Sequence, residues 1–446
     1  MRVIVYPSKL VGEQIAPASK SSMQRACAAA LIHKGATIIH NPGHSNDDLA
    51  ALDVIQKLGA IVTINNVEKK IANHLAPQET NKKSITITSN GVVPIGPVMN
   101  CGESGLGIRM FTPIAALSHQ LIKIEGKGSL VKRPMHFFDE ILPLLGVTIK
   151  SQKGFLPLEI KGPLQPAHIT VDGSLSSQFL TGLLMAFAAA EVHNAAIKVV
   201  DLKSKPYIDL TLAVLHQFGW NVKHTNYERF TFHSHVPLKP LIEYTVEGDW
   251  SGAAFLLVAG AIAGPIKVKG LQLDSTQADK KIISALISAN ASITIEVDGI
   301  ILGPNKNLEN GKQEPLKSFH FDATDCPDLF PPLVALACYC DGVTEIKGVN
   351  RLAHKESDRG ITLQSEFGKM GVNIILDGDV MQIQGGNEVK STQVFSQHDH
   401  RIAMASAVAA LGANGPITIT EAEAINKSYS DFFMDLQQLG AKLVVE

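Results

Sequence analysis

The chain has 446 residues, a formal net charge of −2 and a sequence pI near 6.8. This length is too great for one ordinary hydrophobic core and predicts two or three domains. The near-neutral charge balance excludes a general attraction to nucleic acid or to an anionic membrane, so any cationic site must be local.

The first residues, MRVIVYPSKLVGEQIA, alternate like a strand and lack the apolar core and cleavage site of a signal peptide. The longest apolar runs, such as residues 252 to 264, are shorter than the roughly 18 to 20 residues that cross a bilayer. Five scattered cysteines form neither a CxxC pair nor a zinc-type spacing. We therefore expect a cytoplasmic protein with reduced thiols, no metal and no membrane contact.

Six segments rich in alanine and leucine follow one another along the chain. They begin at residues 19, 102, 173, 248, 324 and 398, so successive starts are 71 to 83 residues apart. A second signal, in which a helix end and a small residue lead into a strand, recurs with the same period in stretches such as KLGAIVTI, QFGWNVKH and KMGVNIIL. This period exceeds the roughly 20 to 50 residues of solenoid repeats. It fits a small α/β unit of two helices and several strands.

Each of these helical segments is apolar nearly all round, so we expect it to lie inside its domain with strands packed around it. Grouped three and three, the six units predict two similar domains with a boundary near Glu247. No linker rich in glycine, serine or charge separates the halves, so short strand-like crossings should join them.

Polar residues gather where the apolar helices begin. They are Lys20, Ser21 and Arg25; Gly105 and Arg109; Ser176, Ser177 and Gln178; Asp325 and Asp328; and Asp399, His400 and Arg401. A helix N-terminus has unpaired N–H groups and a partial positive charge, which favour phosphate or carboxylate. Ser19, Ser174 and Asp325 could instead be simple N-caps. Recurrence in nearly every unit favours one shared anionic site.

The window RLAHKESDRG, residues 351 to 360, concentrates charged side chains. Its simplest interpretation is the solvated start of a helix. Lys355 and Arg359 would then lie one turn apart, where like charges repel unless an anion lies between them. This pair therefore favours a binding site.

Taken together and in order, nine features resemble the motifs of the 5-enolpyruvylshikimate-3-phosphate (EPSP) synthase family. They are SKSSMQRA, GESGLGIRM, GSLVKRPM, DGSLSSQFLTGLLM, SKPYIDLT, PDLFP, HKESDR, HDHRIAM and the late Lys427. The resemblance implies an α/β fold of two similar domains, each of three βαβαββ units with buried helices surrounded by sheet. The domains would be residues 19–247, and residues 1–18 plus 248–446, with the active site in the cleft between them.

The resemblance also implies a reaction. The family transfers the enolpyruvyl group of phosphoenolpyruvate to the 5-hydroxyl of shikimate 3-phosphate, releasing phosphate, on the route to chorismate and the aromatic amino acids. Addition is followed by elimination, and no metal, nucleotide or organic cofactor takes part. We expect these two small molecules as partners, no nucleic acid, and a monomeric protein.

By the same resemblance, residues of this chain take roles in that reaction. Shikimate 3-phosphate would be held by Lys20, Ser21, Arg25, Ser176, Ser177, Gln178, Ser204, Asp328 and Lys355. Phosphoenolpyruvate would be held by Lys20, Gly105, Arg133, Gln178, Arg359, Arg401 and Lys427. Asp328 would be the base that deprotonates the 5-hydroxyl, and Glu356 or Lys20 the acid that protonates C3.

The loop GESGLGIRM departs from the family's more usual GNAGTAMRP at Glu103, Leu106 and Met110. Gly105 keeps the position that lies against phosphoenolpyruvate. These changes leave open the response to glyphosate, the herbicide that occupies this region in the family.

Two alternatives use the same scaffold. A UDP-N-acetylglucosamine enolpyruvyl transferase usually has a reactive cysteine shortly before its Arg-Pro, whereas GKGSLVKRP has none and Cys101 lies well upstream. A non-catalytic anion-binding homologue would not need carboxylates such as Asp328 and Glu356 among its cations. We also expect the cations of the two domains to lack counter-charges, so that the domains stay apart until an anionic ligand binds.

Overall fold

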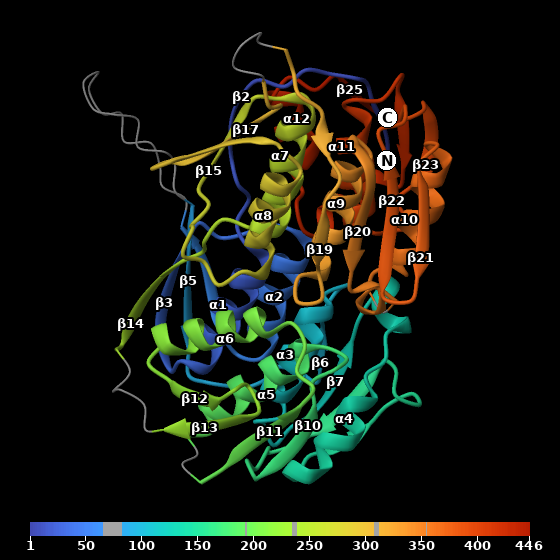
Figure 1. Ribbon diagram of the computed structural model, residues 1–446. Helices are drawn as coiled ribbons and strands as arrows, with labels where there is room; N and C mark the ends of the chain where they lie inside the picture. Colours follow the sequence, from blue (N-terminus) through green and yellow to red (C-terminus); the bar gives the residue numbers. More distant parts are fainter. Residues whose placement is uncertain (66–82, 192–193, 234–238, 307–311, 354) are drawn as a thin grey trace, which may run out of the picture. The chain divides into compact units, whose positions relative to one another are not determined.

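The computed structural model describes residues 1–65, 83–191, 194–233, 239–306, 312–353 and 355–446 (Figure 1). His354 of the HKESDR motif lies outside these residues. The chain divides into two compact units, Ala18–Glu247, here called the continuous unit, and Met1–Pro17 with Gly248–Glu446, here called the split unit. In the described ranges, every helix is too short or too polar to cross a bilayer.

Within its described residues, the continuous unit has three four-stranded sheets that share one pattern. A parallel pair of strands is followed by two antiparallel pairings. The first sheet has the order β14 (Leu241–Thr245), β3 (Gly35–His40), β5 (Ser84–Ser89), β4 (Ile61–Asn65). The second is β6 (Val98–Asn100), β7 (Leu121–Glu125), β9 (Leu158–Lys161), β8 (Thr148–Lys150), and the third is β10 (Ile169–Asp172), β11 (Ala196–Val200), β13 (Arg229–His233), β12 (Asn221–Thr225).

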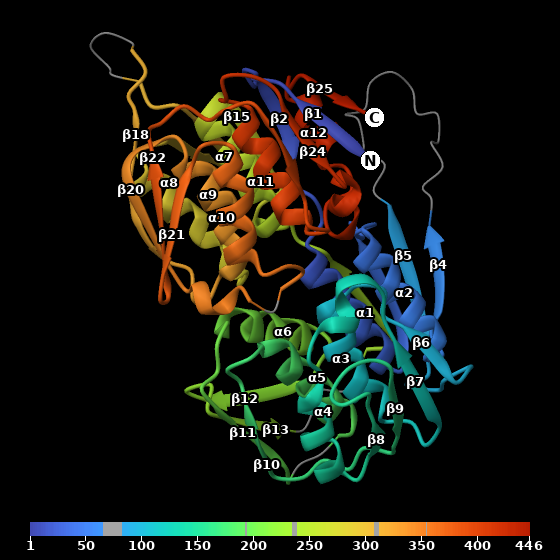
Figure 2. The ribbon, with the colours of Figure 1, turned by 90° about the vertical axis from the view of Figure 1, so that its right-hand side faces the viewer.

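Two kinds of helix accompany these sheets. α1 (Lys20–Ile32), α3 (Gly105–Ala115) and α5 (Ser177–Ala189) are buried almost along their whole length. α2 (Asn46–Lys57) and α6 (Lys205–Gln217) bury one face only, and α4 (His136–Ile141) is short. Figure 2 shows α1, α3 and α5 inside the unit with strands around them. The predicted position of the apolar helices is thus confirmed.

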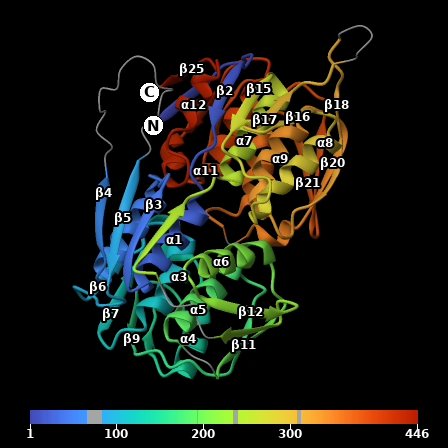
Figure 3. The same ribbon diagram turned by 90° about the vertical axis from the view of Figure 1, so that its left-hand side faces the viewer.

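The split unit repeats this plan. In the described ranges, its first sheet has the order β2 (Gly12–Ile15), β15 (Ile266–Lys269), β17 (Gly299–Gly303), β16 (Ser292–Glu296). In the second, β18 (Leu316–Lys317) and β19 (His320–Asp322) both pair with β20 (Cys340–Lys347), which is followed by β22 (Val380–Gly385) and β21 (Asn373–Asp377). The third has the order β23 (Thr392–Phe395), β24 (Ile417–Thr420), β1 (Arg2–Val5), β25 (Leu443–Val445). The buried helices are α7 (Trp250–Ala263), α9 (Phe330–Ala337) and α11 (His400–Ala410), visible inside the strands in Figure 3. The outer ones are α8 (Ile282–Ser288), α10 (Arg359–Lys369) and α12 (Phe432–Gln438).

The order β10–α5–β11–α6–β12–β13 is one complete βαβαββ unit, so the expected repeat is confirmed. Three sheets are completed by distant parts of the chain. β14, at the end of the continuous unit, pairs in parallel with β3 near its beginning. β1 pairs with β24 and β25, and β2 pairs with β15, which places residues 1–17 in the split unit.

Candidate active site

In the continuous unit, polar contacts link the first two turns of four helices. Ser104, the N-cap of α3, donates to Gln24 of α1 at 2.9 Å. Arg109 of α3 donates to Gln178 of α5 at 2.9 Å. Arg25 of α1 donates to the Tyr207 carbonyl in the first turn of α6 at 3.2 Å. Four helix N-termini therefore gather in one region, where their N–H groups and dipoles favour an anion.

Arg25 is the most buried cation of this region, with only 1% of its surface exposed. Its guanidinium donates to Thr211 Oγ1 and to the Ser21 carbonyl, both at 2.9 Å, as well as to Tyr207. All three acceptors are neutral oxygens. Burial lowers the pKa of Arg25 to about 10, against smaller opposing effects of Tyr207 and Tyr244. A buried cation surrounded by neutral oxygens is suited to hold a ligand anion.

Lys20 lies at the start of α1 and forms an ion pair with Asp47 of α2 at 3.0 Å. Both side chains are largely buried. Ser19 is the N-cap of α1, as the simpler interpretation predicted. Asp47 received no role from the sequence, because nothing in the pattern of α2 distinguishes it from an ordinary residue of the first turn.

The serines expected to bind phosphate occupy helix starts. Ser176, rather than Ser174, is the N-cap of α5, and Ser177 is its buried first residue. Ser204 precedes α6 with φ of 55°, a left-handed conformation in which its side chain makes no capping bond to the helix. These hydroxyls and Gln178 lie where α5 and α6 begin.

Arg133 approaches Gly105 closely. A Cβ atom added at Gly105 would lie 2.5 Å from Arg133 Nη1. Arg133 follows the short helix η1 (Gly128–Lys132), is largely buried, and donates to Ser129 Oγ at 3.3 Å. Glycine at the start of α3 therefore lets a guanidinium lie directly against a helix N-terminus. Arg109, which the sequence placed at a helix start without naming a substrate for it, adds a second buried guanidinium beside Gln178.

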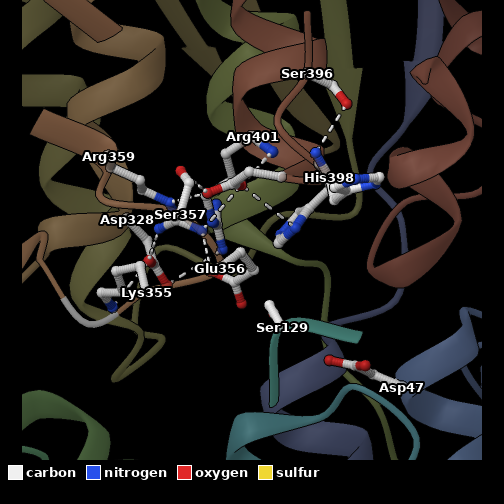
Figure 4. Close-up of polar contacts among 12 residues, drawn as sticks. Asp47, Ser129, Asp328, Lys355, Glu356, Ser357, Arg359, Ser396, His398 and Arg401 are labelled. Atoms are coloured by element: carbon white, nitrogen blue, oxygen red, sulfur yellow. Dashed lines mark hydrogen bonds and ion pairs between the residues drawn. The ribbon is translucent and has the colours of Figure 1, made fainter. Parts of the chain in front are cut away.

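In the split unit, three cations share one carboxylate. Asp328, in the short helix η4 (Pro327–Leu329), contacts Arg359 Nη1 at 2.7 Å and Lys355 Nζ at 3.2 Å. Its other oxygen contacts Arg401 Nη2 at 3.2 Å. Figure 4 shows these side chains converging on Asp328. Burial would raise the pKa of Asp328, but the charges of the three cations outweigh it and hold that pKa well below its usual range.

Two further carboxylates hold Arg359, whose side chain is only 1% exposed. Asp399, the N-cap of α11, accepts from Nε at 2.7 Å and from Nη2 at 3.2 Å. Glu356 accepts from Nη2 at 2.5 Å. Arg359 is thereby fixed by three acids, and its pKa is raised because their charges outweigh the cost of burial. Burial is also the main reason that the pKa of Lys355 is lowered.

Two expectations about this motif were wrong. Lys355 and Arg359 are not one turn apart on a helix, because α10 begins at Arg359 with Asp358 as its N-cap. The cations of this unit also have counter-charges, contrary to the second expectation. Lys355, Arg359 and Arg401 are balanced by Asp328, Glu356 and Asp399. The cluster is formally neutral, so like-charge repulsion does not describe it.

Lys427 and Asp279 complete this half. Lys427 ends the short helix η6 (Ala422–Lys427), which packs against α11, and is largely buried. Asp279, in η3 (Ala278–Lys281), was not expected in the site. Burial raises its pKa to about 6, with Asp328 adding to the shift and Arg401 opposing it. A carboxyl group that changes charge near neutrality therefore acts electrostatically on Asp328.

The structure thus brings the predicted residues into two clusters, one in each unit. Lys20, Ser21, Arg25, Gly105, Arg133, Ser176, Ser177, Gln178 and Ser204 belong to the continuous unit, and Asp328, Lys355, Glu356, Arg359, Arg401 and Lys427 to the split unit. Cys101 is buried, and burial raises the pKa of its thiol. A buried, protonated thiol is unsuited to nucleophilic or acid catalysis at neutral pH. In the described residues no group of three or more His, Cys, Asp or Glu side chains is arranged to hold a metal ion.

The chain resembles known proteins along most of its length. The family profile described as EPSP synthase (3-phosphoshikimate 1-carboxyvinyltransferase) matches residues 4–436. A 3-phosphoshikimate 1-carboxyvinyltransferase of Clostridium botulinum (strain Alaska E43) is 36% identical over 98% of this chain and 96% of its own.

Solved structures show the same fold. EPSP synthase from Acinetobacter baumannii has a TM-score of 0.78 at 24% identity, with all of both chains covered. The enolpyruvyl transferase NikO from Streptomyces tendae has a TM-score of 0.75 at 17% identity and covers 99% of this chain and 98% of its own. Because a differently named enolpyruvyl transferase shares the fold, the profile and the sequence relative carry the assignment. This chain belongs to the EPSP synthase family of 3-phosphoshikimate 1-carboxyvinyltransferases.

Proposed function

We propose that the protein transfers the enolpyruvyl group of phosphoenolpyruvate to the 5-hydroxyl of shikimate 3-phosphate. The observation that carries this proposal is Asp328, a carboxylate bound to three cations beside a second acid, Glu356. Joining these substrates requires a base for the hydroxyl, an acid for C3, and cations for two phosphates and two carboxylates. The two clusters together contain groups of all three kinds.

In the continuous unit, the proposed ligand is shikimate 3-phosphate. Ser176, Ser177 and Ser204 would donate neutral hydrogen bonds to its phosphate at the starts of α5 and α6. Arg25, whose contacts are neutral oxygens, would supply the charge. Ser21 and Gln178 would bind its remaining oxygens.

Phosphoenolpyruvate would be held by guanidinium groups and lysines. Arg133 lies against Gly105 at the start of α3, and a guanidinium fork matches a carboxylate or phosphate with two parallel hydrogen bonds. Lys20 and Lys427 would add point charges. Arg359 and Arg401 would contribute from the cluster around Asp328.

Asp328 would serve as the base only after substrate has bound. With three cations around it, its pKa is far too low for a strong base. The phosphate and carboxylate of the substrates would compete with Asp328 for Lys355 and Arg401. Loss of those contacts would raise the pKa of Asp328 towards the range of a useful base. Substrate binding would therefore activate the carboxylate that the reaction needs.

The proton transfers then follow in order. Asp328 takes the proton of the 5-hydroxyl as its oxygen attacks C2 of phosphoenolpyruvate, and Glu356 or Lys20 delivers a proton to C3. The tetrahedral intermediate expels phosphate and C3 loses a proton, which restores the enol ether. Arg359 contacts both Asp328 and Glu356 through one guanidinium, so with Glu356 as the acid it would fix the distance between base and acid.

The test compares acceptors. Purified protein is incubated with phosphoenolpyruvate and either shikimate 3-phosphate, UDP-N-acetylglucosamine or no acceptor, and released phosphate is measured. Release with shikimate 3-phosphate alone supports the proposal, release with the nucleotide sugar supports the rival transferase, and no release supports a binding protein. The protein would act as a cytoplasmic monomer, which sedimentation and cell fractionation can check.

A further inference from the structure

We propose that the outer face of the β10-β11-β13-β12 sheet carries an accessory binding site for a dianionic phosphoryl group. A hollow of about 280 Å³ lies on this sheet, lined by His168, Ile169, Thr170, Ala196, Lys198 and Arg229. Four of these six residues can donate hydrogen bonds through their side chains. None of them belongs to the clusters described above.

The hollow faces away from the helices of its unit. Side chains alternate between the two faces of a strand. Val171, Ile197 and Phe230 point inward and are buried, while their neighbours Thr170, Lys198 and Arg229 are exposed. Figures 1 and 3 show this sheet at the lower edge of the picture, with α5 and α6 on its other side. The sheet thus separates the hollow from the helix N-termini that hold Ser177 and Arg25.

Lys198 and Arg229 lie directly opposite each other on the antiparallel strands β11 and β13. Side chains in such a pair start about 5 Å apart, and like charges in this position destabilise a sheet. In the part of the chain that the structure describes, no ion pair joins either residue to a carboxylate. An anion between them would replace this repulsion with two attractive contacts.

The rest of the hollow completes a phosphoryl site. Ala196 pairs with Thr231 in the row next to Lys198 and Arg229, and its small side chain leaves room above the sheet. Thr170, in register with Lys198 on β10, supplies a hydroxyl, and His168 supplies an imidazole. Two fixed positive charges match a phosphoryl group, which carries close to two negative charges at neutral pH, better than they match a single carboxylate. The ligand would be inorganic phosphate or the phosphate of a monoester.

The test follows acylation of single lysines by mass spectrometry. The full chain is treated with an acetylating ester while inorganic phosphate, phenyl phosphate or chloride at matched ionic strength is titrated. Lys223, exposed on β12 of the same sheet, is the internal control. Phosphate should slow acetylation of Lys198 by about threefold or more and leave Lys223 unchanged, since a bound anion shields only the amine that contacts it.

A variant separates specific binding from general screening. Arg229→Gln removes one of the two charges from an exposed position. It should raise the midpoint, the phosphate concentration that gives half of the protection of Lys198, by about fivefold or more, as expected for a lost charged contact. Its thermal stability and turnover check that the fold is retained. Equal protection by phosphate and chloride, or an unchanged midpoint in the variant, would overturn the proposal. A lower midpoint for phenyl phosphate than for phosphate would identify a monoester as the ligand. Equal midpoints would show that the site recognises the phosphoryl group alone.

Discussion

Replacing Asp328 by asparagine removes the charge at the centre of the split unit's cluster while keeping the side chain's size. Asp328 contacts Lys355, Arg359 and Arg401 at 3.2, 2.7 and 3.2 Å. Loss of a general base should lower turnover by about 10²- to 10⁴-fold, which is about 3 to 5 kcal/mol in activation free energy. Phosphoenolpyruvate should bind as well or better, because the cations no longer have Asp328 as a competing anion.

Phosphate release at saturating substrates measures the first effect, and calorimetric titration of phosphoenolpyruvate measures the second. Asp322→Asn is the matched control, because that carboxylate is exposed on β19 and its ion pair with Lys347 is 3.5 Å long. It should leave turnover unchanged. Near-normal turnover in Asp328→Asn would show that the base lies elsewhere, and a large loss of phosphoenolpyruvate affinity would show that Asp328 organises the cations.

The same variant should change the stability of the protein in acid. The pKa of Asp328 is lower in the folded state than in the unfolded state, where it is about 3.9. Its contribution to stability is therefore complete above the unfolded pKa and is lost as the pH falls through the folded one. Urea denaturation from about pH 5 to pH 3 should show a smaller loss of unfolding free energy in Asp328→Asn than in the parent.

Three further predictions concern Gly105, Asp48 and the activation of Asp328 by substrate. Gly105→Ala places a Cβ 2.5 Å from Arg133 Nη1, whereas ordinary contacts are 3.4–4 Å long. It should therefore raise the KM for phosphoenolpyruvate about 10- to 100-fold in steady-state assays. The control Gly368→Ala, where nothing lies within 4 Å of the added Cβ, should leave that KM unchanged. Burial raises the pKa of Asp48 to about 6, so the parent should lose up to about 3 kcal/mol of unfolding free energy between about pH 4 and pH 7. Asp48→Asn should not show this loss. Urea denaturation measures both, and an equal dependence of unfolding free energy on pH in the two proteins would refute the prediction. If substrates activate Asp328, the acid limb of kcat should lie at higher pH than that of kcat/KM, and coincident limbs would contradict the mechanism.

The fold was largely predictable because each repeat carries its own local signals. Apolar helices and the glycines that follow outer helices recur along the chain, and the structure places α3 and α7 inside sheets as that pattern requires. The partner of β14 was not predictable. Its pattern of alternating burial is typical of any half-buried strand, and its parallel neighbour β3 lies near the other end of the unit. Local sequence encodes the element but not its distant partner.

The sequence singled out the cations of these clusters more readily than their acids. Arg359 and Arg401, which the motifs had named, contact Asp328 in the structure. Asp47 and Asp399 each form an ion pair with a cation from another helix. Such a pair between distant positions produces no periodic pattern in the sequence. Asp399 did stand at a recognisable helix start. A carboxylate there is commonly only an N-cap, whereas here it caps α11 and holds Arg359 as well.

The pairing of β1 with β24 and β25 has a consequence for biosynthesis. The first strand of the chain cannot find its partners until residues 417–445 have been made, and β2 must wait for β15. β1 and β2 therefore remain unpaired long after they are made, while the continuous unit can close its first sheet as soon as β14 appears. Such long-range pairing slows folding, because the chain must close large loops before the contacts form. We expect the continuous unit to fold first, and the split unit to complete its sheets last, when β1 and β2 pair with their partners.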